Sequence, residues 1–244
     1  MKQFVYLAGM PRSGSTLLLS ILNQNPNIFA SSSSPLCNML YQSETLWKQQ
    51  LALGANPNDD AVLRVLSSMI PEYYADKNQE IIIDKSFNWG LSENLELVHR
   101  FSPTTPKFIV MDRNWDSVVE SVVCLFFANP QNKIVNENMV YPFNHDSIRN
   151  FITAEGNILW KCKISKENIL NYYSSNSTVV EYERFCSEPD EVIHEIYKML
   201  EIPYFLHWYT GIENSNLDND SFWGIPKMHE IRTEVGHHGT LRIS

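Results

Sequence analysis

The sequence predicts an α/β fold, a three-layer sandwich in which a central parallel sheet lies between two layers of helices. Apolar runs of three to five residues alternate with longer stretches that have helical periodicity. A turn of small residues joins the first apolar run to the first helical stretch. The length of 244 residues suits one such unit, and we expect a single domain over residues 1–244.

The apolar runs are rich in Val, Ile, Phe and Tyr, as in strands that are buried on both faces. In chain order they are residues 4–8, 28–30, 80–83, 107–111 and 178–181. The stretches predicted as helices are residues 15–24, 35–51, 60–75, 92–101, 115–128, 146–173 and 189–200. Asn114 is a suitable N-cap for the fifth of them. Residues 129–145 and 211–221 are rich in Asn, Asp or Pro, and we expect loops there, the second exposed or mobile.

Composition excludes several classes of partner. The net charge of −9 argues against a broad nucleic-acid surface, so an anionic ligand needs a local cluster of cations. No apolar run approaches the roughly 20 residues that span a membrane, and the start of the chain does not resemble a signal peptide. We therefore expect a cytoplasmic protein. The four cysteines include no Cys-x-x-Cys pair, which argues against a metal site.

The most informative motif follows the first predicted strand. It consists of Gly9, Met10 and then Pro11-Arg12-Ser13-Gly14-Ser15-Thr16-Leu17. A strand, a small-residue turn and a helix form a cradle for phosphate, because the first N–H groups of the helix lack partners there. The loop of nucleoside-triphosphate enzymes has a lysine after its second glycine. Here that lysine is absent, and the cation is Arg12, before Gly14.

A second constellation follows the predicted strand at residues 107–111. Arg113 comes at its end, and Ser121 lies about two turns into the next helix. An arginine and a hydroxyl suit a phosphate group, and a parallel sheet brings this strand end to the same crevice as the first motif. Taken alone, these residues also fit a surface Arg–Asp pair and a serine buried under a helix.

Together the two motifs resemble the sulfotransferases that use 3′-phosphoadenosine 5′-phosphosulfate (PAPS). In that family a loop of the first type binds the 5′-phosphosulfate, and an Arg with a Ser eight residues later binds the 3′-phosphate. The resemblance covers most of the chain. It implies a P-loop-like nucleotide-binding fold, PAPS as donor, and adenosine 3′,5′-bisphosphate (PAP) as product, with no metal. The donor-binding residues that it implies include Arg12, Ser13, Gly14, Ser15, Thr16, Leu17, Arg113 and Ser121.

Further residues follow from the same resemblance. Tyr182, in a Tyr-Glu segment, matches a tyrosine near the adenosine, and Lys85 matches a lysine near the transferring sulfuryl group. Lys85 also fits a solvated strand end. In the family a late basic loop covers the 3′-phosphate, and Lys227 and Arg232 match it loosely. A structural or mobile tail fits these two residues equally well.

The expected reaction is sulfuryl transfer to a hydroxyl or amine acceptor. Arg12 and Lys85 would stabilise the charge that moves to the leaving phosphate. A general base must take the proton of an alcohol. Relatives that act on protein tyrosine have a glutamate soon after the second strand, where this chain has serines. We name Glu44 as the candidate, with His99 and His145 as others.

Two alternatives stay open. The first is a nucleotide-dependent kinase with the same loop topology, in which Asp112 would bind magnesium. The second is a non-catalytic nucleotide-binding module of the same fold, which the missing base motif would suit. The acceptor class stays open among a small molecule, a sugar and a peptide, and the sequence gives no oligomeric state.

Overall fold

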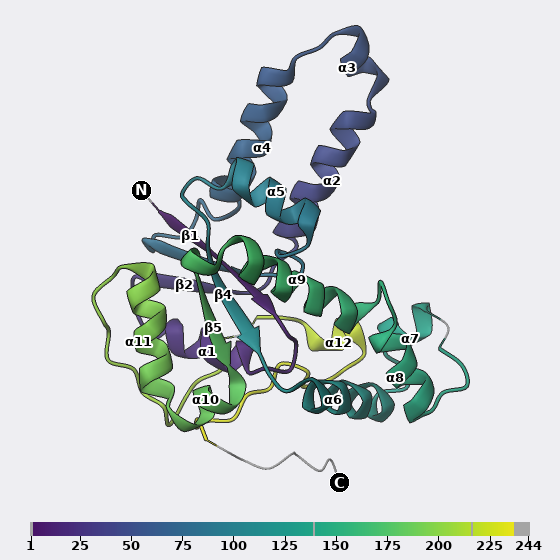
Figure 1. Ribbon diagram of the computed structural model, residues 1–244, viewed down its shortest axis with the longest axis vertical. Helices are drawn as coiled ribbons and strands as arrows, with labels where there is room; N and C mark the ends of the chain where they lie inside the picture. Colours follow the sequence, from purple (N-terminus) through teal and green to yellow (C-terminus); the bar gives the residue numbers. More distant parts are fainter. Residues whose placement is uncertain (1, 139, 216, 237–244) are drawn as a thin grey trace.

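The computed structural model describes residues 2–138, 140–215 and 217–236. Its centre is a sheet of five strands in the order β2-β3-β1-β4-β5, and every neighbouring pair is parallel (Figure 1). The strands are β1 (Gln3–Gly9), β2 (Ile28–Ser33), β3 (Ile81–Lys85), β4 (Lys107–Asp112) and β5 (Ser177–Glu181). The parallel sheet predicted from the sequence is therefore confirmed.

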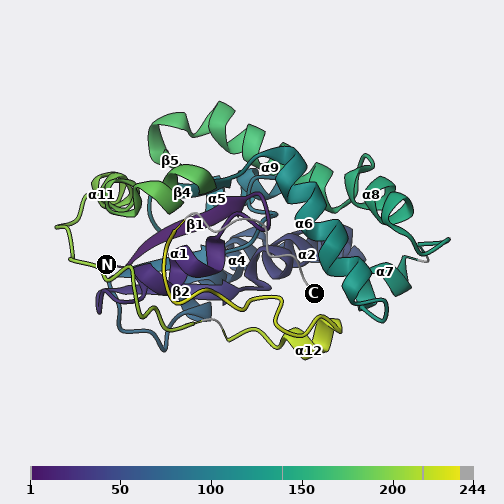
Figure 2. The ribbon, with the colours of Figure 1, turned by 90° about the horizontal axis from the view of Figure 1, so that it is seen from below.

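Helices cover both faces of this sheet (Figures 1 and 2). The bounds are α1 (Ser15–Leu22), α2 (Leu36–Gln49), α3 (Leu51–Ala55), α4 (Asp59–Tyr73), α5 (Ser92–Phe101), α6 (Trp115–Ala128), α7 (Lys133–Glu137), α8 (His145–Thr153), α9 (Ile158–Tyr172), α10 (Tyr182–Ser187), α11 (Pro189–Leu200) and α12 (Asp220–Trp223). One apolar core lies between the sheet and α1, α10 and α11. A second core lies between the opposite face and α2, α4, α5 and α9.

The register of the strands brings their carboxyl ends to one edge of the sheet. Gly9 at the end of β1 pairs with Met111 of β4, and Asp112 pairs with Glu181 of β5. On the other side of β1, Leu7 pairs with Lys85 at the end of β3. The segments that follow β1, β3, β4 and β5 therefore begin beside one another, where parallel sheets bind their ligands.

Some element boundaries differ from those predicted. The single helix expected over residues 146–173 is two helices, α8 and α9, because Gly156 has a φ of 78° and Ala154 leaves the helical region. The helix expected over residues 35–51 is likewise interrupted, since Gln50 between α2 and α3 is extended. Residues 182–187 form α10, a helix that the sequence did not predict.

Helices α2, α3 and α4 form an arm that extends away from the sheet, with α3 at its tip (Figure 1). Leu51 at this tip is 92% exposed, whereas Leu36 and Leu40 at the base of α2 are buried in the second core. Within the part of the chain that the structure describes, no helix is both long enough and apolar enough to cross a membrane.

Candidate functional site

The loop between β1 and α1, residues 10–14, has a backbone path that depends on two glycines. Gly9 has a φ of 110°, and a Cβ there would lie 2.1 Å from the carbonyl oxygen of Met111. Gly14 has a φ of 79° and serves as the N-cap of α1, where a Cβ would lie 3.1 Å from the ring of Tyr182. Arg12 also has a positive φ, 58°. A positive φ is readily adopted by glycine, whereas it strains the backbone of a residue that has a Cβ, such as Arg12.

Loop 10–14 leads directly into the amino end of α1, where no side chain caps the helix. The hydroxyl of Ser13, which is fully buried, donates to the carbonyl oxygen of Met10. Ser13 therefore stabilises the loop with its side chain and offers a ligand its backbone N–H. Ser15 and Thr16 follow in the first turn, which has no acidic residue to compete for the free N–H groups.

Arg12 lies at the centre of the contacts around loop 10–14. Its Nε donates to Oγ of Ser121 at 3.2 Å, and its Nη1 donates to the carbonyl oxygen of Met228 at 2.9 Å. Burial lowers the pKa of Arg12, and the charge of Arg113 lowers it further. Two guanidinium groups thus lie together at the amino end of α1, an arrangement that an anion would stabilise.

Arg113 connects loop 10–14 to the segment after β5. Its Nη1 donates to the carbonyl oxygen of Arg12 at 2.6 Å, and its guanidinium carbon lies 4.3 Å from the centre of the Tyr182 ring. Its Nε is buried without a hydrogen-bond partner, 4.0 Å from a carboxylate oxygen of Glu183. Arg12, Arg113 and Ser121, from the two sequence motifs, are therefore brought together, and Tyr182, which the family resemblance added, lies beside Arg113.

Lys85 is a buried lysine at the end of β3, with only 2% of its surface exposed. Burial lowers its pKa to about 8, and Arg12 acts in the same direction. The carboxylates of Asp218 and Asp220 oppose this shift. The surroundings of Lys85 thus differ from the solvated strand end that the sequence left open, and they include both Arg12 and the C-terminal segment.

The C-terminal segment crosses the site on the side of α1 and β2 (Figure 2). We call residues 217–230 the strap. Leu217 N donates to Oγ of Ser32 at 2.6 Å, and the Met228 carbonyl accepts from Arg12. Most of residues 211–221 are exposed, as expected, but Asp218 and Asp220 are largely covered, at 14% and 17% side-chain exposure.

The two basic residues predicted in this region are placed differently. Lys227 is 75% exposed, and its ammonium lies 3.5 Å from Glu230. Burial raises the pKa of the Tyr182 phenol, and Arg232, in contrast to Lys227, is close enough that its charge acts against this rise. The structure therefore brings Arg232, rather than Lys227, towards the Arg113–Tyr182 pair.

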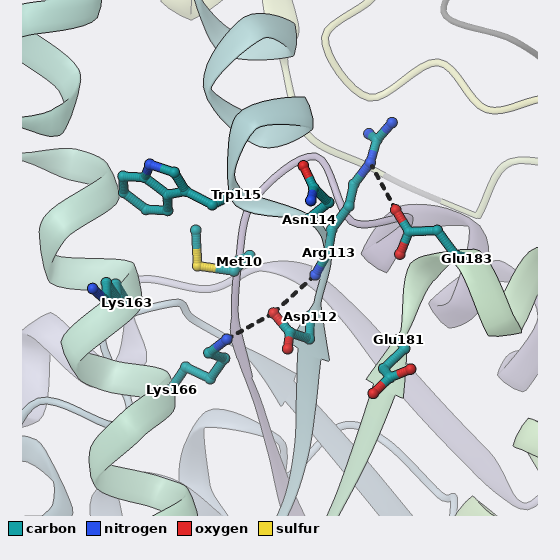
Figure 3. Close-up of a pocket in the computed structure, with 9 residues that line it drawn as sticks. All are labelled: Met10, Asp112, Arg113, Asn114, Trp115, Lys163, Lys166, Glu181 and Glu183. Carbon is teal, nitrogen blue, oxygen red and sulfur yellow. Dashed lines mark hydrogen bonds and ion pairs between the residues drawn. The ribbon is translucent and has the colours of Figure 1, made fainter.

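A cavity of about 340 Å³ opens beside the ends of β4 and β5 (Figure 3). It lies next to loop 10–14, and its lining residues are Met10, Asp112, Arg113, Asn114, Trp115, Lys163, Lys166, Glu181 and Glu183. Lys166 of α9 is bound to the Asp112 carboxylate at 2.8 Å, and Asp112 also accepts from the Arg113 N–H at 2.9 Å. The carboxylate of Asp112 is thus already bound by protein groups.

Comparison with known families agrees with this geometry. A model described as "Sulfotransferase family" matches residues 5–205 of the chain, which include loop 10–14, Lys85, Arg113, Ser121 and Tyr182. The chain belongs to the sulfotransferase family. The resemblance inferred from the two motifs is therefore confirmed at the level of the family.

This family member is similar to a putative sulfotransferase and to several solved structures. A putative protein-tyrosine sulfotransferase from Caenorhabditis briggsae is 22% identical over 241 residues, which cover 96% of this chain and 79% of the relative. Two solved structures share the fold. A sulfotransferase from Alicyclobacillus acidocaldarius has a TM-score of 0.54 and 14% identity, over 91% of this chain and 87% of its own. A mouse sulfotransferase complexed with PAP has a TM-score of 0.51 and 14% identity, and the match covers 84% of this chain and 61% of the mouse protein.

The candidate bases named from the sequence lie in other surroundings. The carboxylate of Glu44 is buried and bound by Lys48 at 2.7 Å and by Arg100 at 3.2 Å. His99 lies beside the hydroxyl of Tyr173, and the ring of His145 packs against Phe127. Glu44 thus joins α2 to α5, and none of the three has a described contact with loop 10–14.

The sequence reasoning missed three residues that lie near the site. Asp218, Asp220 and His229 are on the strap, which contains only the short helix α12 and follows no sheet strand directly. The two aspartates had only one signal, the concentration of Asn and Asp in residues 211–221, and His229 lies outside that stretch. Across residues 2–138, 140–215 and 217–236, no group of three or more His, Cys, Asp or Glu residues is arranged to hold a metal ion.

Proposed function

We propose that this family member transfers a sulfuryl group from PAPS to a hydroxyl or amine acceptor. The observation that carries the proposal is the meeting of Arg12, Arg113 and Ser121 at the amino end of α1. One cation follows each of two neighbouring strands, which suits a donor that has phosphate groups at both ends. The fold shared with a mouse sulfotransferase complexed with PAP supports the same donor.

The residues present fit such a donor. The buried Nε of Arg113 is a donor without a hydrogen-bond partner, and buried polar groups in native proteins nearly always have one. Gly14 leaves the entrance to α1 free of a side chain, and Tyr182 beside it offers an aromatic surface. Under this proposal Arg113, Ser121 and Arg232 bind the 3′-phosphate, and Tyr182 contacts the adenosine.

The chemical step is a displacement at sulfur. A bond forms between the acceptor oxygen or nitrogen and sulfur while the bond from sulfur to the 5′-phosphate oxygen breaks, and PAP leaves with that electron pair. Arg12, Lys85 and the N–H groups of residues 13–16 stabilise the charge on the leaving phosphate. Their role resembles that of the fixed donors in phosphoryl transfer.

The acceptor is proposed only as a class. The similarity to a putative protein-tyrosine sulfotransferase makes a phenol in a peptide the first acceptor to test, before small alcohols and sugars. The kinase alternative gains no support from Asp112, because Lys166 and the Arg113 N–H already bind the carboxylate that would hold magnesium.

A transfer assay tests the proposal. The protein would be incubated with ³⁵S-labelled PAPS and a panel of tyrosine peptides, phenols, alcohols, amines and sugars, with EDTA present. We expect labelled product with at least one acceptor class. Tight PAP binding without transfer to any acceptor would favour a non-catalytic module, and activity that requires ATP and magnesium would favour a kinase.

A further inference from the structure

The proposed reaction needs a group that takes the proton of a hydroxyl acceptor. Glu44, the sequence candidate, is bound by two cations away from loop 10–14. The end of β2 offers the run Ser31 to Ser34 and no carboxylate of its own. The structure brings other carboxylates to that place, because Leu217 and Asp218 of the strap contact Ser32 and Ser33.

The strap is bound to the rest of the protein at two places, one near its start and one near its end. At one end, Asp218 Oδ2 accepts from the backbone N–H of Ser33 at 3.4 Å. At the other, the Met228 carbonyl accepts from Nη1 of Arg12 at 2.9 Å. Burial lowers the pKa values of Lys85 and Arg12, and strap carboxylates act against this lowering: Asp218 and Asp220 do so at Lys85, and Asp220 does so at Arg12. Residue 229 follows directly after the carbonyl that Arg12 binds.

His229 is held in one orientation by Asp220. Its Nδ1 lies 2.6 Å from Asp220 Oδ1, and its backbone N–H donates to Asp220 Oδ2 at 2.9 Å. An ionised carboxylate only accepts hydrogen bonds, so this contact places a proton on Nδ1 and leaves the lone pair of a neutral imidazole on Nε2. The His229 side chain is 12% exposed, which limits its motion.

We propose that His229 is the general base of the transfer reaction and that Asp220 is its positioning residue. This inference rests on the proposed function. Nε2 takes the proton of the acceptor hydroxyl as the oxygen–sulfur bond forms and the bond from sulfur to the 5′-phosphate breaks. The resulting imidazolium lies between Asp220 and Asp218, whose Oδ2 is 3.5 Å from Nε2. It returns its proton to solvent after the product leaves.

The arrangement matches the requirements for a base held by a third group. The base nitrogen and its orienting carboxylate are at hydrogen-bond distance, as in Ser-His-Asp sites. The separation of Nε2 from Asp218 exceeds the usual range of about 2.7–3.2 Å for a hydrogen bond, so Nε2 is not saturated by that contact.

The test compares His229→Gln with the unaltered protein and with His194→Gln as matched control. His194 is another histidine beside a carboxylate, with Nε2 3.7 Å from Asp190, on α11 away from loop 10–14. We expect His229→Gln to lose about 10²- to 10⁴-fold in kcat with an unactivated alcohol or tyrosine peptide, and PAP affinity to stay unchanged. With 4-nitrophenol, much of which is already ionised near neutral pH, we expect a much smaller loss. His194→Gln should match the unaltered protein.

Three outcomes would overturn the inference. The first is a kcat for His229→Gln close to that of the unaltered protein. The second is an equal loss with 4-nitrophenol and with the unactivated acceptor, which would show a structural role. The third is a loss confined to Asp218→Asn, which would make that carboxylate the base. Absence of transfer by the unaltered protein would overturn the proposed function along with the inference, whereas the first three outcomes leave the proposed function intact.

Discussion

Loop 10–14 and the strap contribute to the same site, but they are built in different ways. The loop follows a buried strand directly, and the backbone of β4 and the ring of Tyr182 fix its path. The strap joins no strand of the sheet, and its position depends on side-chain and backbone contacts with Ser32, Ser33 and Arg12. The donor side of the site is thus part of the core framework, whereas the proposed acceptor side is added to it by the end of the chain.

The largest expected effect within this comparison is on Arg12, which lies where the loop and the strap meet. Arg12→Ala removes a fixed charge at the leaving phosphate, and we expect kcat at saturating PAPS to fall about 10²- to 10³-fold, with weaker PAP binding as well. Steady-state kinetics with varied PAPS would measure both. Full turnover at saturating donor would show that Arg12 does not act in the chemical step.

A second substitution tests whether the loop belongs to the core framework. Gly9→Ala would place a Cβ 2.1 Å from the Met111 carbonyl oxygen at a φ of 110°, and we expect the free energy of unfolding to fall by more than about 2 kcal/mol. Urea denaturation would measure it. Gly54→Ala is the matched control, since a Cβ there meets nothing within 4 Å and Gly54 lies in α3. Equal stability of the two variants would contradict the tight packing of the loop on β4.

Loop 10–14 could be predicted from the sequence, whereas the strap could not. A strand, a small-residue turn and a helix are local features, so the loop could be found from the local pattern, whereas Arg113 and Ser121 were identified only together with the loop and the family resemblance. Gly156, which separates α8 from α9, lies inside an otherwise helical pattern, and its positive φ left no clear signal. Glu44 is bound by Arg100 of a later helix, and the strap that carries His229 is placed by Ser32, Ser33 and Arg12, which lie far earlier in the chain. No local pattern encodes such contacts, which is why Glu44 was named and His229 was missed.

Arg113 allows the donor side to be examined without affecting the chemical step. Arg113→Lys keeps the charge but loses the planar group that donates to the Arg12 carbonyl and lies over Tyr182. We expect PAP to bind about 10- to 100-fold more weakly, because hydrogen bonds to charged groups contribute roughly 1.5–3 kcal/mol. Titration calorimetry would measure the affinity. A comparable loss of kcat at saturating PAPS would instead place Arg113 at the reacting centre.

The smallest effect concerns pH and Lys85. Its buried ammonium is influenced by Arg12 of loop 10–14 and by Asp218 and Asp220 of the strap. The pKa of Lys85 is about 8, so its charge is present below that pH and is lost above it. Binding of an anion that needs this charge should therefore weaken as pH rises, by about tenfold between pH 7 and pH 9. Lys85→Met should bind PAP more weakly at pH 7, and its affinity should vary less over this range. Parallel pH profiles for the two proteins would show that Lys85 does not contact the donor.

The central claim is that loop 10–14 and Arg113 form a binding site for a nucleotide with phosphates at both ends. Calorimetric titration of the unaltered protein with PAP in EDTA tests this claim most directly, with adenosine 5′-monophosphate and ATP as comparison ligands. The account predicts metal-independent binding of PAP that is at least tenfold tighter than that of adenosine 5′-monophosphate, since the 3′-phosphate adds charge-assisted hydrogen bonds. Equal affinities for PAP and adenosine 5′-monophosphate, or binding of ATP alone with magnesium, would contradict it.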